Sequence, residues 1–189
     1  MNFLLSNELI KSNFNKSYRF NDKYFFYDKL FYSFKKKEIF CFILGNIYSI
    51  KNRKFSLSAI KENILKDEFE LLNGRYIIIK IVKNKITIIP DLSGRVDLFY
   101  CSNKNRFKIS NSIYNLAPFI NKKNINQPAM AHSLSIYGFR APKKNSIFEQ
   151  VKRIPPKSII KIEQNLTIEE FKFVPKKIRN NIKIQEFYD

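Results

Sequence analysis

Apolar side chains in this chain occur mostly in runs of consecutive positions, a pattern typical of strands that are covered on both faces. The first part of the chain contains three such runs, at Tyr18–Tyr27, Leu30–Phe34 and Ile39–Leu44, and the last of them ends at Gly45. Aromatic and β-branched residues, which favour strands, fill these runs. We therefore predict that this region is mainly β-structure.

The middle of the chain carries a strong hairpin signal. The apolar runs Arg75–Val82 and Ile86–Ile89 are separated by a short polar turn, and such a pair predicts two antiparallel strands. Asn73-Gly74, just before them, is interpreted as a turn. A helix is predicted within residues 56–72, which open with serines and continue with spaced apolar residues.

The remaining pattern predicts four further strands and two short helices. The strands are expected at Val96–Cys101, Arg106–Ser110, Ser158–Ile162 and Leu166–Phe173, and the helices at Ser112–Phe119 and Gln127–Tyr137. A pair of stacked sheets with helices outside would bury such apolar runs on both faces. The segment Pro175–Asp189 is basic and then aromatic. We interpret residues 175–189 as a C-terminal tail or linker that follows a single domain at residues 1–174.

Composition narrows the class of protein. The chain has 189 residues, of which 44% are hydrophobic and 15% aromatic, and this favours a folded core over intrinsic disorder. No apolar run approaches the roughly 20 residues that cross a bilayer. The start of the chain lacks the basic and hydrophobic regions of a signal peptide. A cytoplasmic protein that does not act at a membrane is expected.

The net charge of +19 raises a nucleic-acid hypothesis, because clustered Lys and Arg side chains bind phosphates. The charge is spread, however, since residues 1–50, 51–100, 101–150 and 151–189 carry +4, +4, +7 and +4. The coding bias of an AT-rich genome accounts for such an excess of Lys. Four short basic runs are interpreted as solvated loops: Lys35–Lys37, Lys122-Lys123, Lys143-Lys144 and Lys176-Lys177.

A basic nucleic-acid-binding module is the main alternative function. Tyr18, Phe20, Tyr24 and Phe26 lie beside basic residues, and aromatic rings in such a setting stack on bases. The same alternation fits a half-buried strand, which we favour, so nucleic acid is not the expected partner. Self-association through exposed strand edges, giving a homo-oligomer, is a further alternative.

Candidate catalytic and metal-binding residues are few. Cys41 and Cys101 lie in apolar surroundings and are interpreted as buried reduced thiols. His132 is the single histidine, so a zinc site of His and Cys ligands is not expected. We interpret His132 and Ser6 as ordinary structural residues. No catalytic residue, cofactor or metal ion is predicted.

Five segments, taken in order, resemble the N-terminal glutaminase domain of the asparagine synthetase and β-lactam synthetase family. The segments are Ile43–Ser49, Leu72–Tyr76, Pro90–Tyr100, Ile109–Leu116 and Ile147–Lys157. In the same order, they are similar to the family motifs F-N-G-E-I-Y-N, L-N-G-M-F, A-R-D-R-x-G-x-x-P-L-Y-Y, F-S-S-E-I-K-A-L and L-F-E-G-I-K-R-L-P-P-G. The resemblance covers about residues 39–174. It implies an α+β fold, the four-layer αββα sandwich of the N-terminal-nucleophile (Ntn) hydrolases and glutamine amidotransferases.

The resemblance also implies a degenerate active site. The family cleaves glutamine with a cysteine that removal of the initiator Met exposes, and here that position is Asn2. The family's oxyanion hole uses the side chain of an Asn and the N–H of the following Gly. Leu44 and Gly45 take these positions here, followed by Asn46. No counterpart is found for the family's glutamine-binding Arg or for a partnering Asp after Tyr48. We therefore predict that glutaminase activity is lost and that the chain is not an enzyme.

The predicted function is that of a catalytically inactive scaffold or accessory subunit for an ATP-dependent, asparagine-synthetase-like amide-forming enzyme. The expected partner is a separate or C-terminally fused synthetase (ATP-pyrophosphatase) domain, because this sequence has no Gly-rich phosphate loop of its own. The resemblance places the partner interface at two turns, around Asp91–Tyr100 and around Arg153–Lys157. Its candidate residues are Asp91, Gly94, Arg95, Tyr100, Arg153, Pro155 and Pro156.

Overall fold

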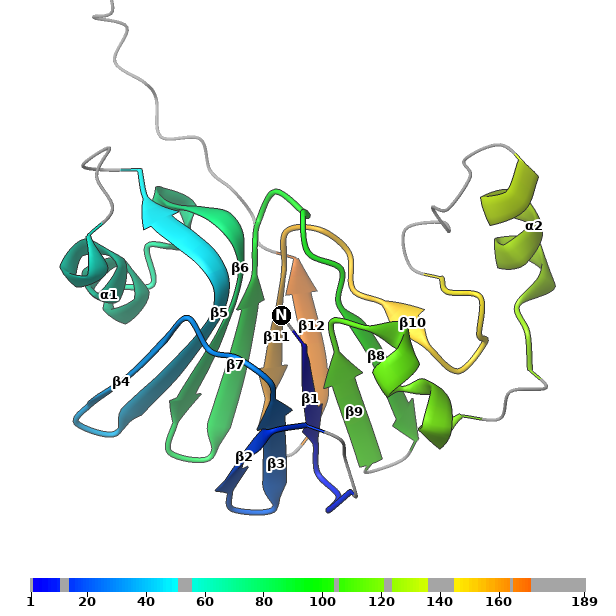
Figure 1. Ribbon diagram of the computed structural model, residues 1–189, viewed down its shortest axis with the longest axis horizontal. Helices are drawn as coiled ribbons and strands as arrows, with labels where there is room; N and C mark the ends of the chain where they lie inside the picture. The colour runs from blue at the N-terminus through cyan, green and yellow to red at the C-terminus, as the bar shows by residue number, and fades with distance from the viewer. Residues whose placement is uncertain are drawn as a thin grey trace, which may run out of the picture.

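Two six-stranded antiparallel sheets form the body of the protein (Figure 1). The computed structural model describes residues 2–10, 14–50, 56–103, 106–120, 124–135, 145–163 and 165–170. The predicted C-terminal tail, residues 175–189, lies outside the described residues, as do the last residues of the predicted helix at 127–137 and of the predicted strand at 166–173. Within the described part of the chain, no helix is both long and apolar enough to span a membrane.

The first sheet, sheet A, has the strand order β10-β8-β9-β1-β3-β2. Its strands are β1 (Phe3–Ser6), β2 (Lys16–Phe20), β3 (Lys23–Tyr27), β8 (Phe99–Asn103), β9 (Arg106–Ser110) and β10 (Lys152–Arg153). The single run predicted at Tyr18–Tyr27 is two strands of a hairpin, because Asn21 adopts a φ of 52° and reverses the chain. β1 was not predicted, yet it lies between β9 and β3 and all four of its residues are buried.

The second sheet, sheet B, has the order β12-β11-β7-β6-β5-β4. Its strands are β4 (Tyr32–Lys36), β5 (Ile39–Ser49), β6 (Leu72–Val82), β7 (Lys85–Pro90), β11 (Ser158–Ile162) and β12 (Leu166–Glu170). The predicted hairpin is confirmed, since β6 pairs with β7 in antiparallel register from Val82 and Lys85 onward. The predicted turn at Asn73-Gly74 is wrong, because both residues lie within β6 and pair with β5.

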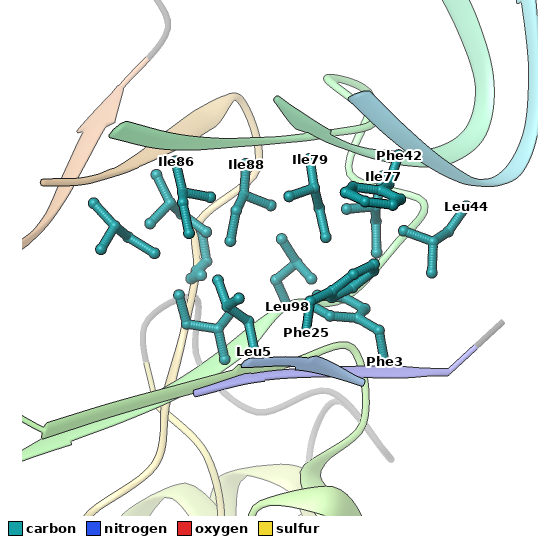
Figure 2. Packing of buried hydrophobic residues seen from close by; sticks show 14 of the residues in the cluster. Phe3, Leu5, Phe25, Phe42, Leu44, Ile77, Ile79, Ile86, Ile88 and Leu98 are labelled. Atoms are coloured by element: carbon teal, nitrogen blue, oxygen red, sulfur yellow. The ribbon is translucent and has the colours of Figure 1, made fainter. Parts of the chain in front are cut away.

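The main core lies between the two sheets (Figure 2). Sheet A contributes aromatic and aliphatic residues such as Phe3 and Phe25, and sheet B contributes mostly isoleucines. Successive side chains of a strand point to opposite faces. Ile77 and Ile79 of β6 accordingly enter this core, whereas Ile78 belongs to a second cluster on the outer face of sheet B.

Helix α1 (Leu57–Leu65) covers part of the outer face of sheet B (Figure 1). Its N-cap is Ser56, whose side chain accepts a hydrogen bond from the Ala59 N–H. Lys80 reaches from β6 to the other end of α1, where its Nζ donates to Asp67 Oδ1 at 2.6 Å and to the Ile64 carbonyl at 3.3 Å. A cation at the end of a helix stabilises its last carbonyls, and this contact holds α1 on the sheet.

The predicted four-layer αββα sandwich is wrong, because the part of the chain that the structure describes is mostly antiparallel β-structure and its helices do not form two complete layers. Sheet A is covered by the 3-10 turns η2 (Ile113–Asn115) and η3 (Ala117–Phe119), which replace the helix predicted there. η1 (Phe69–Leu71) follows α1, and α2 (Gln127–Ser135) lies away from both sheets in Figure 1. The apolar runs predicted that both faces of each sheet are buried, but turns and irregular segments, more than helices, cover the outer face of sheet A.

Candidate functional site

A pocket of about 550 Å³ opens where the chain crosses between the two sheets, and we call it the crossover pocket. Two of its walls are the connections from β3 to β4 and from β7 to β8, each of which leaves one sheet and enters the other. The other walls come from β5, β6 and the end of β9. The lining residues are Lys29, Leu30, Phe31, Gly45, Asn46, Arg75, Arg95, Val96, Asp97 and Asn111.

The floor of the crossover pocket is a close approach between β5 and β6. Asn46 pairs with Arg75, and Gly74 pairs with Ile47. Gly74 has a φ of +128°, and a Cβ atom there would overlap the Asn46 carbonyl oxygen and lie 3.0 Å from the Ile47 Cα. Only glycine fits this backbone without strain. The positions of Asn46 and Arg75 are therefore fixed by backbone geometry.

The N-terminal residues lie beside the same pocket. The Phe3 N–H donates to Asn111 Oδ1 at 3.0 Å, and the Asp28 N–H donates to the Asn2 carbonyl at 3.3 Å. Asn2 precedes Phe3, which is hydrogen-bonded to the lining residue Asn111. Asn2 is itself hydrogen-bonded to Asp28, which precedes the lining residue Lys29. The structure brings Asn2 to the same end of the sandwich as Gly45 and Asn46, although they are distant in sequence.

Leu44 does not line the crossover pocket. Its side chain is completely buried and belongs to the core between the sheets, as Figure 2 shows. Gly45, the next residue, has a φ of 82° and does line the crossover pocket. Of the four predicted degenerate active-site positions, Leu44 therefore serves the fold, and the other three lie at or beside the pocket.

A hydrogen-bonded turn follows β7 and forms the first part of the predicted partner interface. Asp91 is only 2% exposed and accepts hydrogen bonds from the backbone N–H groups of Ser93 and Arg95, both at 3.0 Å. The Arg95 Nε donates to the same carboxylate at 3.0 Å, and this bond raises the pKa of the guanidinium. Asp91 is buried within the protein, so it holds the turn together and is not available to a partner.

The second predicted turn packs against the first. A Cβ atom on Gly94, whose φ is +71°, would lie 2.9 Å from the Pro156 Cβ, so the two turns are in close contact. Arg153 forms an ion pair with Asp97. Tyr100, Arg153 and Pro155 line a second pocket, of about 400 Å³, whose wall also includes Ser158. The two turns are therefore one continuous unit at the junction of the sheets.

The cysteines and Ser6 occupy structural positions. Cys41 is 1% exposed, and burial raises the pKa of its thiol to about 12, so the reactive thiolate is scarce near neutral pH. Cys101 is only partly buried, which differs from the prediction, and this burial still raises the pKa of its thiol. Ser6 is fully buried and accepts a hydrogen bond from the Glu8 N–H at 3.0 Å. None of the three lines the crossover pocket.

The lining of the crossover pocket is largely polar and carries more cations than anions. In the described part of the chain, its lining residues carry amides, guanidinium groups, one ammonium group and one carboxylate, but no thiol, hydroxyl or imidazole. Also among the residues that the structure describes, no three His, Cys, Asp or Glu side chains lie close enough to hold a metal ion. His132 lies on α2, away from this pocket.

The aromatic residues weighed for base stacking have partners within the fold. Tyr18 and Phe20 pack against the core between the sheets. Phe26 is buried, and Tyr24 stacks on it with ring centroids 6.3 Å apart. Lys35–Lys37 are exposed, but Lys35 and Lys36 end β4 and only Lys37 lies in the turn before β5, so this run is not simply a loop. The other three basic runs fall on residues outside the described part.

Lys29, Arg75 and Asn111 were not predicted as site residues. Each comes from a different part of the chain, and pairing between strands brings them to one pocket. Arg75 did carry a signal, because it is a charged residue directly before the apolar run Tyr76–Ile79 of β6. Lys29 and Asn111 had none, since single polar residues next to strands are ordinary loop residues.

Comparisons with known proteins found distant structural similarity alone. No family model and no curated protein matches the chain. It is similar to a glutamine phosphoribosylpyrophosphate amidotransferase from B. subtilis complexed with ADP and GMP, with 9% identity, a TM-score of 0.41 and coverage of 76% of this chain and 32% of that one. It is also similar to a structure described as the allosteric regulatory enzyme of purine biosynthesis, with 10% identity, a TM-score of 0.41 and coverage of 76% and 31%. The chain spans about a third of the length of these proteins.

Proposed function

We propose that this chain is a glutaminase-like protein that has lost glutamine hydrolysis and acts as a scaffold or accessory subunit for an ATP-dependent amide-forming enzyme of the asparagine synthetase type. The observation that carries the loss of activity is the placement of Leu44. An oxyanion hole needs hydrogen-bond donors about 3 Å from the developing negative charge. The Leu44 side chain has no hydrogen-bond donor and is buried in the core.

The nucleophile is missing as well. Asn2 lies beside the crossover pocket, but a carboxamide does not act as a nucleophile toward an amide. The buried Cys41 and Ser6 do not line the pocket, so neither replaces the missing group. Loss of the nucleophile and of an oxyanion donor together removes the two main contributions to amide cleavage.

The scaffold role is supported by the unit made of the two turns. Asp91, Arg95 and the Gly94–Pro156 contact fix the backbone of this unit. A rigid surface favours binding because little conformational entropy is lost on association. The pocket beside Tyr100, Arg153 and Pro155 is a feature that a side chain of the partner synthetase could fill.

The purified chain is expected to release ammonia from L-glutamine no faster than buffer does, because the pocket has no nucleophile. An assay coupled to glutamate dehydrogenase measures the release. Asn2→Ala is the matched control and is expected to give the same background. Ammonia release well above buffer that disappears in Asn2→Ala would contradict the loss of activity.

A synthetase whose coding region adjoins or continues that of this chain is expected to form a complex with it. Charge reversal by Arg153→Asp should weaken the complex about 10-fold or more, because a charge at the interface then opposes its partner. The double variant Arg153→Asp with Asp97→Arg restores the ion pair within this chain. It therefore tests whether the complex is weakened by the lost ion pair or by the reversed charge at the interface. The double variant is also expected to weaken the complex.

Size-exclusion chromatography and calorimetry with the purified synthetase measure this interaction. Lys66→Glu reverses a charge that is 55% exposed at the C-cap of α1, away from the two turns, and should leave the affinity unchanged. If the synthetase does not bind, or if Lys66→Glu weakens the complex as much as Arg153→Asp, the proposed scaffold surface is wrong.

A further inference from the structure

The crossover pocket gathers more positive charge than its own residues neutralise. Three cations, Lys29, Arg75 and Arg95, line it together with one carboxylate, Asp97. Arg95 is paired with Asp91, and Asp97 is paired with Arg153 outside the pocket. Within the described part of the chain, the side chains of Lys29 and Arg75 form no hydrogen bond or ion pair. Two positive charges are therefore left uncompensated at one pocket.

The two uncompensated cations complement each other chemically. A guanidinium group presents a planar fork of N–H donors that matches two phosphate oxygens, and an ammonium group adds a point charge. Arg75 stands on a strand whose backbone is fixed by the approach of Gly74 to β5. A donor held on a rigid strand binds an anion with less loss of conformational freedom than one on a loop.

The size and the remaining lining favour an organic ligand over a bare ion. The volume of about 550 Å³ lies within the range of roughly 300 to 1,000 Å³ that small-molecule sites occupy. Leu30, Phe31 and Val96 form the apolar part of the wall. Asn46 and Asn111 add amide groups that fix the orientation of polar atoms.

We infer that the crossover pocket binds a small organic phosphate, with the phosphate dianion between Arg75 and Lys29 and an apolar part against Leu30 and Phe31. A free amino acid such as glutamine fits less well. Its ammonium group needs an acceptor, and the one carboxylate among the lining residues, Asp97, is already paired with Arg153. The inference goes beyond the proposed scaffold function and does not depend on it.

Calorimetric titration with phenyl phosphate tests this site, because the probe combines a phosphate dianion with an aromatic ring. Binding is expected, and benzoate, which has the same ring but a single charge, should bind at least about 10-fold more weakly because it forms fewer charge-assisted hydrogen bonds. L-glutamine should not compete. Equal binding of benzoate, or displacement of phenyl phosphate by L-glutamine, would overturn the assignment of a phosphate ligand.

Substitutions at the two cations locate the site. Arg75→Gln and Lys29→Gln should each weaken phenyl phosphate binding about 10-fold or more. Both side chains are exposed, and unchanged thermal melting would show that the fold is intact. Lys83→Gln removes the same charge at the β6–β7 turn, at the other end of β6 from Arg75.

Lys83→Gln should leave the affinity unchanged, because it alters the net charge without touching the pocket. No binding of phenyl phosphate to the unsubstituted chain would overturn the inference. An equal loss of affinity in Lys83→Gln and Arg75→Gln would also overturn it, since binding would then follow net charge. Neither result would bear on glutaminase activity or on the synthetase complex, which are measured separately.

Discussion

Gly74→Ala is expected to lower the free energy of unfolding by about 3 kcal/mol or more, because the change adds a Cβ atom where two strands meet. Gly74 has a φ of +128°, and its Cβ would overlap the Asn46 carbonyl oxygen and press on the Ile47 Cα at 3.0 Å. These are backbone atoms, so no side chain can rotate to relieve the overlap. Urea denaturation followed by circular dichroism measures the loss.

The comparison with Gly94→Ala makes this prediction specific. Gly94 also has a positive φ, of +71°, but its added Cβ would meet the Pro156 side chain at 2.9 Å. Pro156 lies in an exposed turn, which can shift more easily than paired strands, so the expected loss is smaller, about 1 to 2 kcal/mol. If Gly74→Ala lowers the free energy of unfolding by no more than Gly94→Ala does, the close approach of β5 to β6 is not rigid.

The same variant connects the fold to the crossover pocket. Relief of the overlap would require β5 and β6 to separate near Asn46 and Arg75, which pair there and line the pocket. Any Gly74→Ala protein that still folds is therefore expected to bind phenyl phosphate more weakly than the unsubstituted chain. Gly94→Ala should retain more of the affinity, because Gly94 does not line the pocket.

Asp91→Ala is expected to lower the free energy of unfolding by about 2 to 3 kcal/mol. The change removes the acceptor of two backbone N–H groups, from Ser93 and Arg95, and leaves the Arg95 side chain without its carboxylate. Arg95 is 44% exposed, so water replaces part of the ion pair, and most of the loss comes from the backbone donors. Urea denaturation measures this difference.

Two further variants separate these contributions. Asp91→Asn keeps the volume and one acceptor oxygen, so it should recover about half of the stability. Asp97→Ala breaks an ion pair in which Asp97 is 49% exposed, and it should cost less than about 1 kcal/mol. If Asp91→Ala is no more destabilising than Asp97→Ala, the buried carboxylate does not organise the turn.

The elements that the sequence predicted well are those with local signals. The hairpin of β6 and β7 and the strand β11, at Ser158–Ile162, needed only apolar runs and a turn between them. α1 was found from its serine N-cap and spaced apolar residues. In each case the information lies within one short continuous segment of the chain, where periodicity and turn chemistry act.

The elements that were wrong or missed depend on partners far along the chain. Asn73-Gly74 has the composition of a turn, but its pairing with β5 makes it part of a strand. β1 has only four residues and is a strand because β9 and β3 lie on either side of it. The expected helical layers failed for a similar reason, since 3-10 turns already cover sheet A.

For the candidate site, the sequence predicted that Asn2 and Leu44 lack the nucleophile and the side-chain donor of a glutaminase, whereas Gly45 is kept, because residue type decides whether a side chain can attack or donate. The sequence also determined the apolar runs that make two buried sheet faces. Only the tertiary structure decided that Leu44 turns into the core and that Lys29 and Arg75 meet at one pocket. Such juxtapositions arise from strand register and chain crossings between distant segments, and no local pattern encodes them.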